Sequence, residues 1–555
     1  MGLSKFIASV ILVVFIGINS FSQIAPLTYL VSFNTKAGSS FSISNPSAYL
    51  SQRAIDRRTR FNIPVDVTDI PVNYWFLDSL NNIPGVTVVA KSKWFNNVTV
   101  MVSDTNVLPI ISSLPFVSAI KSSVNVQRSR PELKNKLTVE KGRGNTYFTN
   151  DSIDYGAAKT QVEMLNGQFL HQLGYDGSDM QIAVMDIGYF DLDNLPQYQH
   201  LRDAGKIIQG PDFVHRDNNV YNGAGIHGTL VMSCMAPNVE GEFVGTAPNA
   251  TYYLLVTEND TSEYPVEEDY WISAAEWADS AGADVFNTSL GYTEFDDSTM
   301  NHTYADMDGN TCRITRGVDM AARKGILSVN SAGNSGTNPW YYISAPADAD
   351  SCLTVGAVGP DRLYAPFSSK GPSFDGRVKP NVAAQGFQGF LIWPGNVIAQ
   401  GNGTSFSGPT MAGMAACLWS AFPYKTNMEI IKAIEMSATQ ANNPDDFEGY
   451  GIPNMAKAFE LLSSTYNANG LNVMVLNNPF MDYFGLMLYA ETNRDLTIYL
   501  YDLSGKKITE QEVKIIAKEP NELILDLHDK LLRAGVYVLK IVSPEGNITM
   551  KVVKQ

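Results

Sequence analysis

The amino-acid sequence predicts an α/β protein in which a parallel sheet carries helices on both faces. A small α+β domain precedes this part and a small all-β sandwich follows it. Three observations support the prediction. Over residues 155–466, short β-rich runs alternate with helical stretches, as in parallel sheets. Residues 23–125 mix strand-like and helix-like runs, and residues 472–555 carry strand-like runs only. A chain of 555 residues has room for about three or four such domains.

The first 22 residues have the pattern of a secretory signal peptide. Lys5 precedes an apolar run from Phe6 to Ile18, and small residues follow, so we expect cleavage after Ser22. The run is shorter than the roughly 20 apolar residues that a membrane-spanning helix needs, and no later segment of the sequence supplies such a stretch. The sequence therefore predicts export without a transmembrane anchor.

Residues 23–125 are predicted to form a small α+β domain of the split β-α-β type. The strand-like runs cover residues 29–33, 86–90, 98–102 and 117–121, and the helix-like runs cover residues 46–60 and 107–114. Between residues 24 and 130 there are ten lysines and arginines against five aspartates and glutamates, whereas the whole chain has a net charge of −16. A basic leader can dock on an acidic body, or the two can be unrelated solvated surfaces.

The acidic remainder of the chain argues against nucleic acid or an anionic membrane as a partner. Between the leader and this remainder, residues 126–154 form a polar stretch with little apolar periodicity. Such a stretch indicates an exposed linker that is open to proteolysis. Its basic residues are Arg128, Arg130, Lys134, Lys136, Lys141 and Arg143.

Several β-rich runs within residues 155–466 carry the α/β prediction. The predicted strands cover residues 181–187, 252–256, 284–288, 326–330 and 353–358, and the predicted helices cover residues 269–281 and 314–324. In open α/β sheets, ligands and reactive groups gather at the carboxyl ends of the strands. Polar residues that follow these strands are therefore the first candidates for function.

Asp186 and His227 are the first two candidates for catalysis. An apolar strand, residues 182–185, delivers Asp186 to its carboxyl end, where aspartate is also a common turn residue. His227 follows Gly225-Ile226 and stands where a helix begins. None of the six histidines lies in a His-Glu-x-x-His arrangement, so the sequence disfavours a zinc hydrolase. Alone, each residue also has an ordinary structural interpretation.

Ser405 and Asn334 complete a candidate site. Ser405 lies at the start of a helix rich in small residues, where unpaired backbone amides and the helix dipole favour negative charge. A serine in this position is a nucleophile or a plain N-cap. Asn334 lies in a glycine-bounded turn after a buried strand, at the same edge of the predicted sheet. Its amide and the backbone N–H of Ser405 would together form an oxyanion hole.

In chain order, the segments around Asp186, His227, Asn334 and Ser405 resemble the subtilase family of serine peptidases. The resemblance extends from residue 155 to about residue 463. It implies a subtilisin-like parallel sheet and a secreted serine endopeptidase that hydrolyses peptide bonds of extended protein segments. Further matching segments are Ser289-Leu290-Gly291, residues 367–372 (Phe-Ser-Ser-Lys-Gly-Pro) and residues 375–380 (Asp-Gly-Arg-Val-Lys-Pro).

The resemblance also implies a role for each residue. Ser405 would attack the scissile carbonyl, His227 would take its proton and later protonate the leaving amine, and Asp186 would orient the imidazole. Asn334 would donate to the oxyanion. This chemistry needs no cofactor, and the family allows structural calcium. The substrate-binding residues implied are Ser289, Leu290, Gly291, Ser331, Ala332, Gly333 and Ser344.

A few positions depart from the family pattern. Phe406, Asn381 and Gln385 stand where the family often has Met, Asp and Pro, and none of these changes removes a catalytic atom. Counting back from Pro346 places Ser344 at the floor of the specificity pocket, where glycine is common. The preferred substrate side chain is therefore left open.

The flanking domains resemble other parts of such enzymes. Residues 23–125 are similar to the inhibitory propeptide of subtilases, which assists folding and occupies the cleft in cis until it is cut away, so maturation is expected within residues 126–154. Residues 472–555 resemble the C-terminal sorting domain of the Bacteroidota type IX secretion system, or form an accessory sandwich that binds carbohydrate or protein. The resemblance implies protein or peptide substrates, the secretion machinery as a partner, and a secreted or outer-membrane-surface location.

Four cysteines in an exported chain permit up to two disulfides. Cys234 and Cys417 lie in apolar runs and are predicted to be buried thiols. A bridge between Cys312 and Cys352 is left open, because the sequence does not decide it.

A weak candidate for a metal site lies at residues 304–310. Its possible ligands are Asp306, Asp308 and Asn310, which surround a glycine as in a fragment of a calcium loop. The downstream glutamate of that pattern is missing at the right spacing. A solvated loop is therefore the favoured interpretation.

Two other functions compete with peptide hydrolysis. A surface binding protein could keep a subtilase fold without turnover, but it gives no reason for all four polar catalytic positions to be present. An esterase of the α/β-hydrolase class fails because its motif order differs and because residues 403–407 end in serine rather than glycine.

Overall fold

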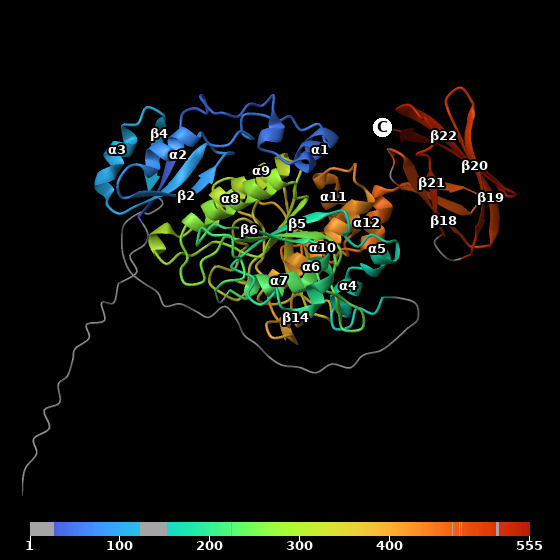
Figure 1. Ribbon diagram of the computed structural model, residues 1–555. Coiled ribbons are helices and arrows are strands. Elements are labelled where there is room, and N and C mark those ends of the chain that lie inside the picture. Colours follow the sequence, from blue (N-terminus) through green and yellow to red (C-terminus); the bar gives the residue numbers. More distant parts are fainter. Residues whose placement is uncertain are drawn as a thin grey trace, which may run out of the picture.

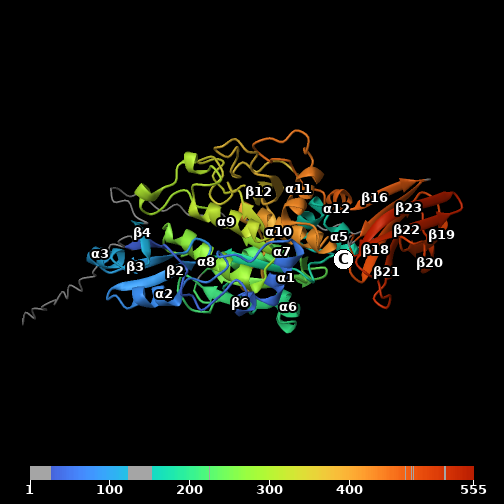
Figure 2. The ribbon, with the colours of Figure 1, turned by 90° about the horizontal axis from the view of Figure 1, so that it is seen from above.

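The computed structural model describes residues 27–122, 153–223, 225–468, 470–476, 478, 480–517 and 521–554. The expected signal peptide, residues 1–22, and residues 126–152 of the expected linker lie outside this part of the chain. The described residues form an N-terminal α+β domain, a central α/β domain and a C-terminal sandwich (Figure 1). Figure 2 shows the sandwich at the opposite end of the molecule from the N-terminal sheet.

The N-terminal domain is an antiparallel sheet in the order β2-β3-β1-β4, which is the strand order of the split β-α-β fold. Its elements are β1 (Thr28–Phe33), α2 (Tyr74–Asn81), β2 (Val86–Ser92), β3 (Asn97–Val102), α3 (Leu108–Ser112) and β4 (Val117–Ser122). The four strands and α3 fall close to their predicted positions. The helix α2, which buries Phe76 and Leu80 against the sheet, was not predicted.

The single helix predicted over residues 46–60 is divided in the structure. A 3₁₀ turn, η1 (Pro46–Ala48), is separated from α1 (Gln52–Arg60). The reason is Ser51, whose extended backbone and side-chain bond from the N–H of Ala54 make it the N-cap of α1. Three arginines follow in the last turn of α1, where positive charge is favourable for a helix.

The central domain is built on a seven-stranded parallel sheet in the order β13-β12-β11-β10-β5-β9-β6. Its strands are β5 (Gln181–Asp186), β6 (Ile207–Asp212), β9 (Thr251–Val256), β10 (Val285–Thr288), β11 (Leu327–Ser331), β12 (Cys352–Val358) and β13 (Val382–Gln385). Alternate residues of β5 enter two different cores, Ile182 and Val184 on one face and Ala183 and Met185 on the other. The predicted sheet with two covered faces is confirmed.

Helices cover each face of this sheet (Figure 1). One core takes in α7 (His227–Met235), α10 (Thr404–Ala421), α11 (Asn427–Ser437) and α12 (Met455–Leu462), together with the short α4 (Lys159–Met164) and α5 (Gln168–Gln172). The other core takes in α8 (Val266–Ala281) and α9 (Arg313–Arg323). The N-terminal domain lies on this second face, where Val89 of β2 shares an apolar cluster with Tyr264 and Val266 of the central domain.

The C-terminal domain consists of two four-stranded antiparallel sheets, in the orders β16-β17-β18-β21 and β20-β19-β22-β23, around a common core. The predicted sandwich is confirmed. The strands are β16 (Ser464–Ala468), β17 (Leu471–Leu476), β18 (Tyr483–Ala490), β19 (Arg494–Tyr501), β20 (Lys507–Ile515), β21 (Asn521–Asp526), β22 (Gly535–Ser543) and β23 (Gly546–Lys554). Since β16 pairs with β17, the sandwich sheet begins at Ser464.

All four cysteines are buried and free, so the bridge left open between Cys312 and Cys352 does not form. Burial raises the pKa of the Cys234 thiol to about 12 and that of Cys417 well above its ordinary value, as expected for inert core thiols. Within the described ranges, helices of the length and apolarity needed to cross a bilayer are absent.

Candidate active site

Asp186 is the last residue of β5 and is fully buried at the carboxyl edge of the central sheet. Its Oδ1 atom accepts from the backbone N–H of Ile187 at 2.8 Å and from Nδ1 of His227 at 2.8 Å. A strand end of this kind gives the carboxylate little freedom. The carboxylate is therefore held in one orientation toward the imidazole.

His227 is the first residue of α7, and its side chain is 24% exposed. The helix starts close against the loop that follows β5, because Gly228 donates its N–H to the carbonyl of Gly188 at 3.0 Å. A Cβ atom on Gly228 would come within 2.5 Å of that carbonyl oxygen, so only glycine fits there. With Nδ1 bonded to Asp186, Nε2 is the ring nitrogen that is free to exchange a proton with a reacting group.

Ser405 lies in the first turn of α10 and is largely buried. Its hydroxyl donates to the carbonyl of Ser289 at 3.3 Å, and the hydroxyl of Ser289 donates to the carbonyl of Ser405 at 3.1 Å. The ring of the next residue, Phe406, lies with its centroid 6.1 Å from that of His227. The starts of α10 and α7, which carry Ser405 and His227, are therefore in contact. In the described structure no hydrogen bond joins these two residues.

Asn334 is exposed in the loop after β11 and is linked directly to the segment that carries Ser405. Its Oδ1 accepts from the N–H of Thr404 at 2.9 Å and from the hydroxyl of Thr404 at 3.1 Å. Because the oxygen is bound on that side, the Nδ2 group is the part of the amide left to donate elsewhere. Thr404 was not singled out from the sequence, although its position next to Ser405 could have drawn attention to it.

The predicted substrate-binding residues come together beside Ser405. Ser289, Leu290 and Gly291 follow β10, and Ser331 at the end of β11 donates to the carbonyl of Thr404 at 2.8 Å. The segment that carries Ser344 is joined to the segment after β10 by the N–H of Tyr292, which donates to the carbonyl of Ala345 at 2.8 Å.

Ser344 lies between the two segments that carry Gly291 and Gly333. A Cβ atom added to Gly291 would lie 2.1 Å from the Ser344 hydroxyl oxygen, and one added to Gly333 would lie 3.1 Å from it. Ser369 reaches the same place, since it lies 2.8 Å from a Cβ added to Gly333. Ser369 was missed from the sequence, although it stands in the matching run of residues 367–372.

The weak metal candidates occupy two turns. Asp306 accepts from the N–H of Thr303 at 2.7 Å, which caps the 3₁₀ turn η5 (Tyr304–Asp306). Asp308 accepts from the N–H groups of Asn310 and Thr311 at 2.9 and 2.7 Å. Both carboxylates thus hold the loop together, which favours the solvated-loop interpretation over a calcium site.

A buried carboxylate bonded to an imidazole, beside a serine at a helix start, lies at the carboxyl edge of a parallel sheet. This fold and site define a serine hydrolase of the α/β class. Residues 97–451 match the model of the subtilase family, Peptidase S8. Residues 28–138 match the Peptidase S8 propeptide domain of Bacteroidota, and residues 476–555 match the secretion system C-terminal sorting domain. The chain belongs to the subtilase family.

The chain is also similar to other proteins, two of which are subtilisins. Subtilisin E of Bacillus subtilis (strain 168) is 31% identical over 309 residues, which cover 55% of this chain and 71% of that protein. Subtilisin DY of Bacillus licheniformis is 29% identical over 315 residues, which cover 55% of this chain and 98% of that protein. The crystal structure of MycP1 from the ESX-1 type VII secretion system has a TM-score of 0.44 at 21% identity and covers 60% of this chain and 91% of that chain.

The family assignment confirms three predictions from the sequence. The chain is a serine endopeptidase of the subtilisin type, it carries a propeptide domain at its N-terminal side, and it carries a type IX secretion sorting domain at its C-terminal side. The sorting domain indicates export.

Proposed function

We propose that the enzyme cleaves extended protein segments with Ser405 as nucleophile, His227 as general base and acid, and Asp186 as the group that orients the imidazole. The observation that carries the proposal is the 2.8 Å bond between Nδ1 of His227 and the buried carboxylate of Asp186. This bond fixes the tautomer with the proton on Nδ1, so Nε2 can accept the proton of Ser405. It also stabilises the imidazolium that forms.

Attack by Ser405 requires its hydroxyl to leave the carbonyl of Ser289 and turn toward Nε2 of His227. In the proposed step the Ser405 side chain rotates about its Cα–Cβ bond, and long or poorly aligned catalytic hydrogen bonds are common before substrate binds. Negative charge then develops on the substrate oxygen. The Nδ2 group of Asn334 and the backbone N–H of Ser405 would stabilise it, and the start of α10 contributes a favourable dipole.

The substrate would bind as an extended strand between residues 289–291 and 331–333, so that main-chain hydrogen bonds supply affinity. Ser344 would form the floor of the pocket for the side chain before the scissile bond. Because its hydroxyl lies close to both Gly291 and Gly333, we expect this pocket to prefer small side chains. Catalysis needs no cofactor, and we assign no residue to calcium.

Export and maturation complete the proposal. A signal peptide of residues 1–22 would lead the chain out of the cytoplasm, and residues 472–555 would direct it through the type IX machinery to the medium or the outer-membrane surface. The domain of residues 23–125 would inhibit the enzyme in cis until the chain is cut within residues 126–154.

The test is Ser405→Ala in the full chain. Hydrolysis of a denatured protein should be lost, with kcat/KM falling by roughly 10⁴-fold or more, because no other group supplies the nucleophile. Asn427 provides a control site away from the cleft. It is buried, as Ser405 is, and its side chain donates to the carbonyls of Ala322 and Ile326. Asn427→Asp is expected to keep activity in whatever fraction folds. Activity that survives in Ser405→Ala contradicts the proposal.

A further inference from the structure

The helix α1 lies outside the core of the N-terminal domain to which it belongs. That core is formed by the strands and by α2 and α3, and none of the described residues 34–71 takes part in it. Instead, α1 packs on the central domain. Ala54 is fully buried, and the ring of Phe61, just after the helix, stacks on Trp419 of α10 at 6.1 Å. In Figure 1, α1 lies above α9 and α11, well apart from α3. Residues 51–69, here the α1 segment, thus form a second contact with the enzyme.

The α1 segment satisfies carbonyl groups at the C-terminal end of α8. Ser51 donates its N–H to the carbonyl of Ser280 and its hydroxyl to that of Ala281, both at 2.8 Å. Arg53 donates to the carbonyl of Gly282 at 3.2 Å. The last carbonyls of a helix have no partner within the helix and carry partial negative charge, so serine and arginine donors suit them.

Arg57 extends this capping to α9. Its side chain is 3% exposed, and it donates to the carbonyl of Lys324 at 3.1 Å and to the carbonyl of Ala283. The same guanidinium pairs with the carboxylate of Asp279 at 2.5 Å. All of these partners belong to the central domain.

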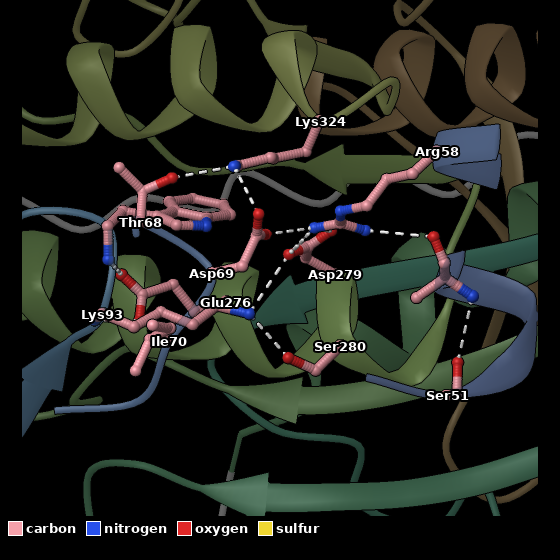
Figure 3. A network of polar contacts seen from close by, with 12 residues as sticks. Ser51, Arg58, Thr68, Asp69, Ile70, Lys93, Glu276, Asp279, Ser280 and Lys324 are labelled. Carbon is pink, nitrogen blue, oxygen red and sulfur yellow. Dashed lines mark hydrogen bonds and ion pairs between the residues drawn. The ribbon is translucent and has the colours of Figure 1, made fainter. Parts of the chain in front are cut away.

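Asp279 is the centre of the charge cluster. It is fully buried, and Arg58 and Lys93 pair with it at 2.9 and 3.2 Å (Figure 3). These two pairs add to that of Arg57. Burial alone would raise the pKa of this carboxyl, but the positive charges of Lys93, Arg58 and Arg57 outweigh burial and hold the pKa below its ordinary value. Each of these cations comes from the N-terminal domain.

Lys324 supplies the opposite pairing. It follows α9 in the central domain, and its Nζ contacts Asp69 at 3.0 Å and the hydroxyl of Thr68 at 2.8 Å, both in the α1 segment (Figure 3). On the central domain, acidic Asp279 thus faces basic groups of the α1 segment, and basic Lys324 faces an acidic group of that segment. Such alternation of sign disfavours wrong partners and wrong registers.

This surface lies at the other edge of the sheet from the cleft. The ends of α8 and α9 lead into the amino ends of β10 and β11, whereas Asp186, Ser289 and Asn334 stand at the carboxyl ends of their strands. Strands β5, β10 and β11 are parallel neighbours, so the two edges are separated by the length of the strands. Binding at the ends of α8 and α9 neither fills nor contacts the cleft.

We propose that the C-terminal ends of α8 and α9, with Asp279 and Lys324, form a docking site for the α1 segment, and that this docking keeps the N-terminal domain on the enzyme after the chain is cut within residues 126–154. Once the chain is cut, only non-covalent contacts hold the domain. The consequence of this docking for inhibition rests on the proposed function, whereas the docking itself does not depend on catalysis.

The test uses the full chain with Ser405→Ala and a recognition sequence for an unrelated, site-specific protease within residues 126–152. After cutting, the Kd of the N-terminal fragment is measured by dilution and gel filtration. The fragment should stay bound, and Arg57→Gln should raise the Kd by about 100-fold, because Asp279 then remains buried with one cation fewer. The matched control is Arg60→Gln, an exposed arginine of the same helix whose bond across the contact is long, 3.4 Å to the carbonyl of Pro423, so it should raise the Kd far less than Arg57→Gln. Equal Kd values for the two variants overturn the proposal.

A second variant separates docking from folding. Asp279→Asn changes the central domain, and its effect should be strongly non-additive with that of Arg57→Gln if the two side chains act through their contact. Additive effects contradict the docking role. Because an external protease makes the cut and the Kd reports binding alone, the result does not depend on which residue is the nucleophile.

Discussion

The catalytic cleft and the docking site of the α1 segment use polar residues in opposite ways. In the cleft, polar atoms keep unused hydrogen-bonding capacity. The buried Oδ2 of Asp186 has no hydrogen-bond partner among the described residues, and the hydroxyl of Ser405 makes one long hydrogen bond. At the docking site each charge is met, with three cations around Asp279 and two carboxylates near Lys324. Groups that react are kept available, whereas the charges of the groups that bind are paired with opposite charges.

The comparison predicts that changes in the two regions have separate effects. The largest concerns His227→Ala, which removes the base and leaves the buried Asp186 unpaired. We expect kcat/KM on a peptide substrate to fall by roughly 10⁴-fold or more. Retention of the N-terminal domain, measured by gel filtration after cutting, should not change. A loss of retention in this variant would show that cleft and docking site are coupled.

A smaller effect is expected at the pocket floor. Ser344→Gly removes the hydroxyl that lies close to Gly291 and Gly333, so the pocket should deepen and accept larger side chains. The ratio of kcat/KM for a substrate with phenylalanine before the scissile bond to that for alanine should rise by roughly 10-fold or more, as expected for the burial of several additional carbons. Profiling with a peptide library measures this ratio. An unchanged ratio would place the selective contact elsewhere.

The smallest expected effect is that of low pH on the docking of the N-terminal domain. A carboxyl with a lowered pKa stabilises the docked state at every pH above its undocked pKa, and this contribution is lost only as the pH falls through the lower docked pKa. Asp279 therefore keeps its charge in mild acid. Burial raises the pKa of Glu276, so protonation of that residue does not weaken docking either. Retention between about pH 8 and about pH 5 should stay constant or rise slightly. Release with a midpoint near pH 6 contradicts this account of the interface.

The sequence was sufficient for the fold and for the candidate site because both depend on local patterns. Alternation of strands and helices predicts the parallel sheet, and the segments of Asp186, His227, Asn334 and Ser405 each carry a local signature. Helix α2 was missed since Tyr74 and Trp75, at its start, are exposed aromatic residues that do not mark an amphipathic helix.

The docking site could not be predicted from local patterns. Arg57 and Asp279 are 222 positions apart in the chain, and only the tertiary structure brings them together. The excess of basic residues in the leader gave a general indication of docking, which the buried ion pairs now specify. The split of the predicted helix at Ser51 follows from the same contact, because Ser51 both caps α1 and donates to α8.

The central claim is that Ser405 is the nucleophile of an active site that includes His227 and Asp186. The most direct measurement is to treat the cut and separated enzyme with a fluorophosphonate and to locate the adduct by peptide mass spectrometry. The account predicts one adduct, on the peptide that contains Ser405, and loss of peptide hydrolysis in proportion to labelling. Labelling of another residue, or full activity after Ser405 has been labelled, would contradict it.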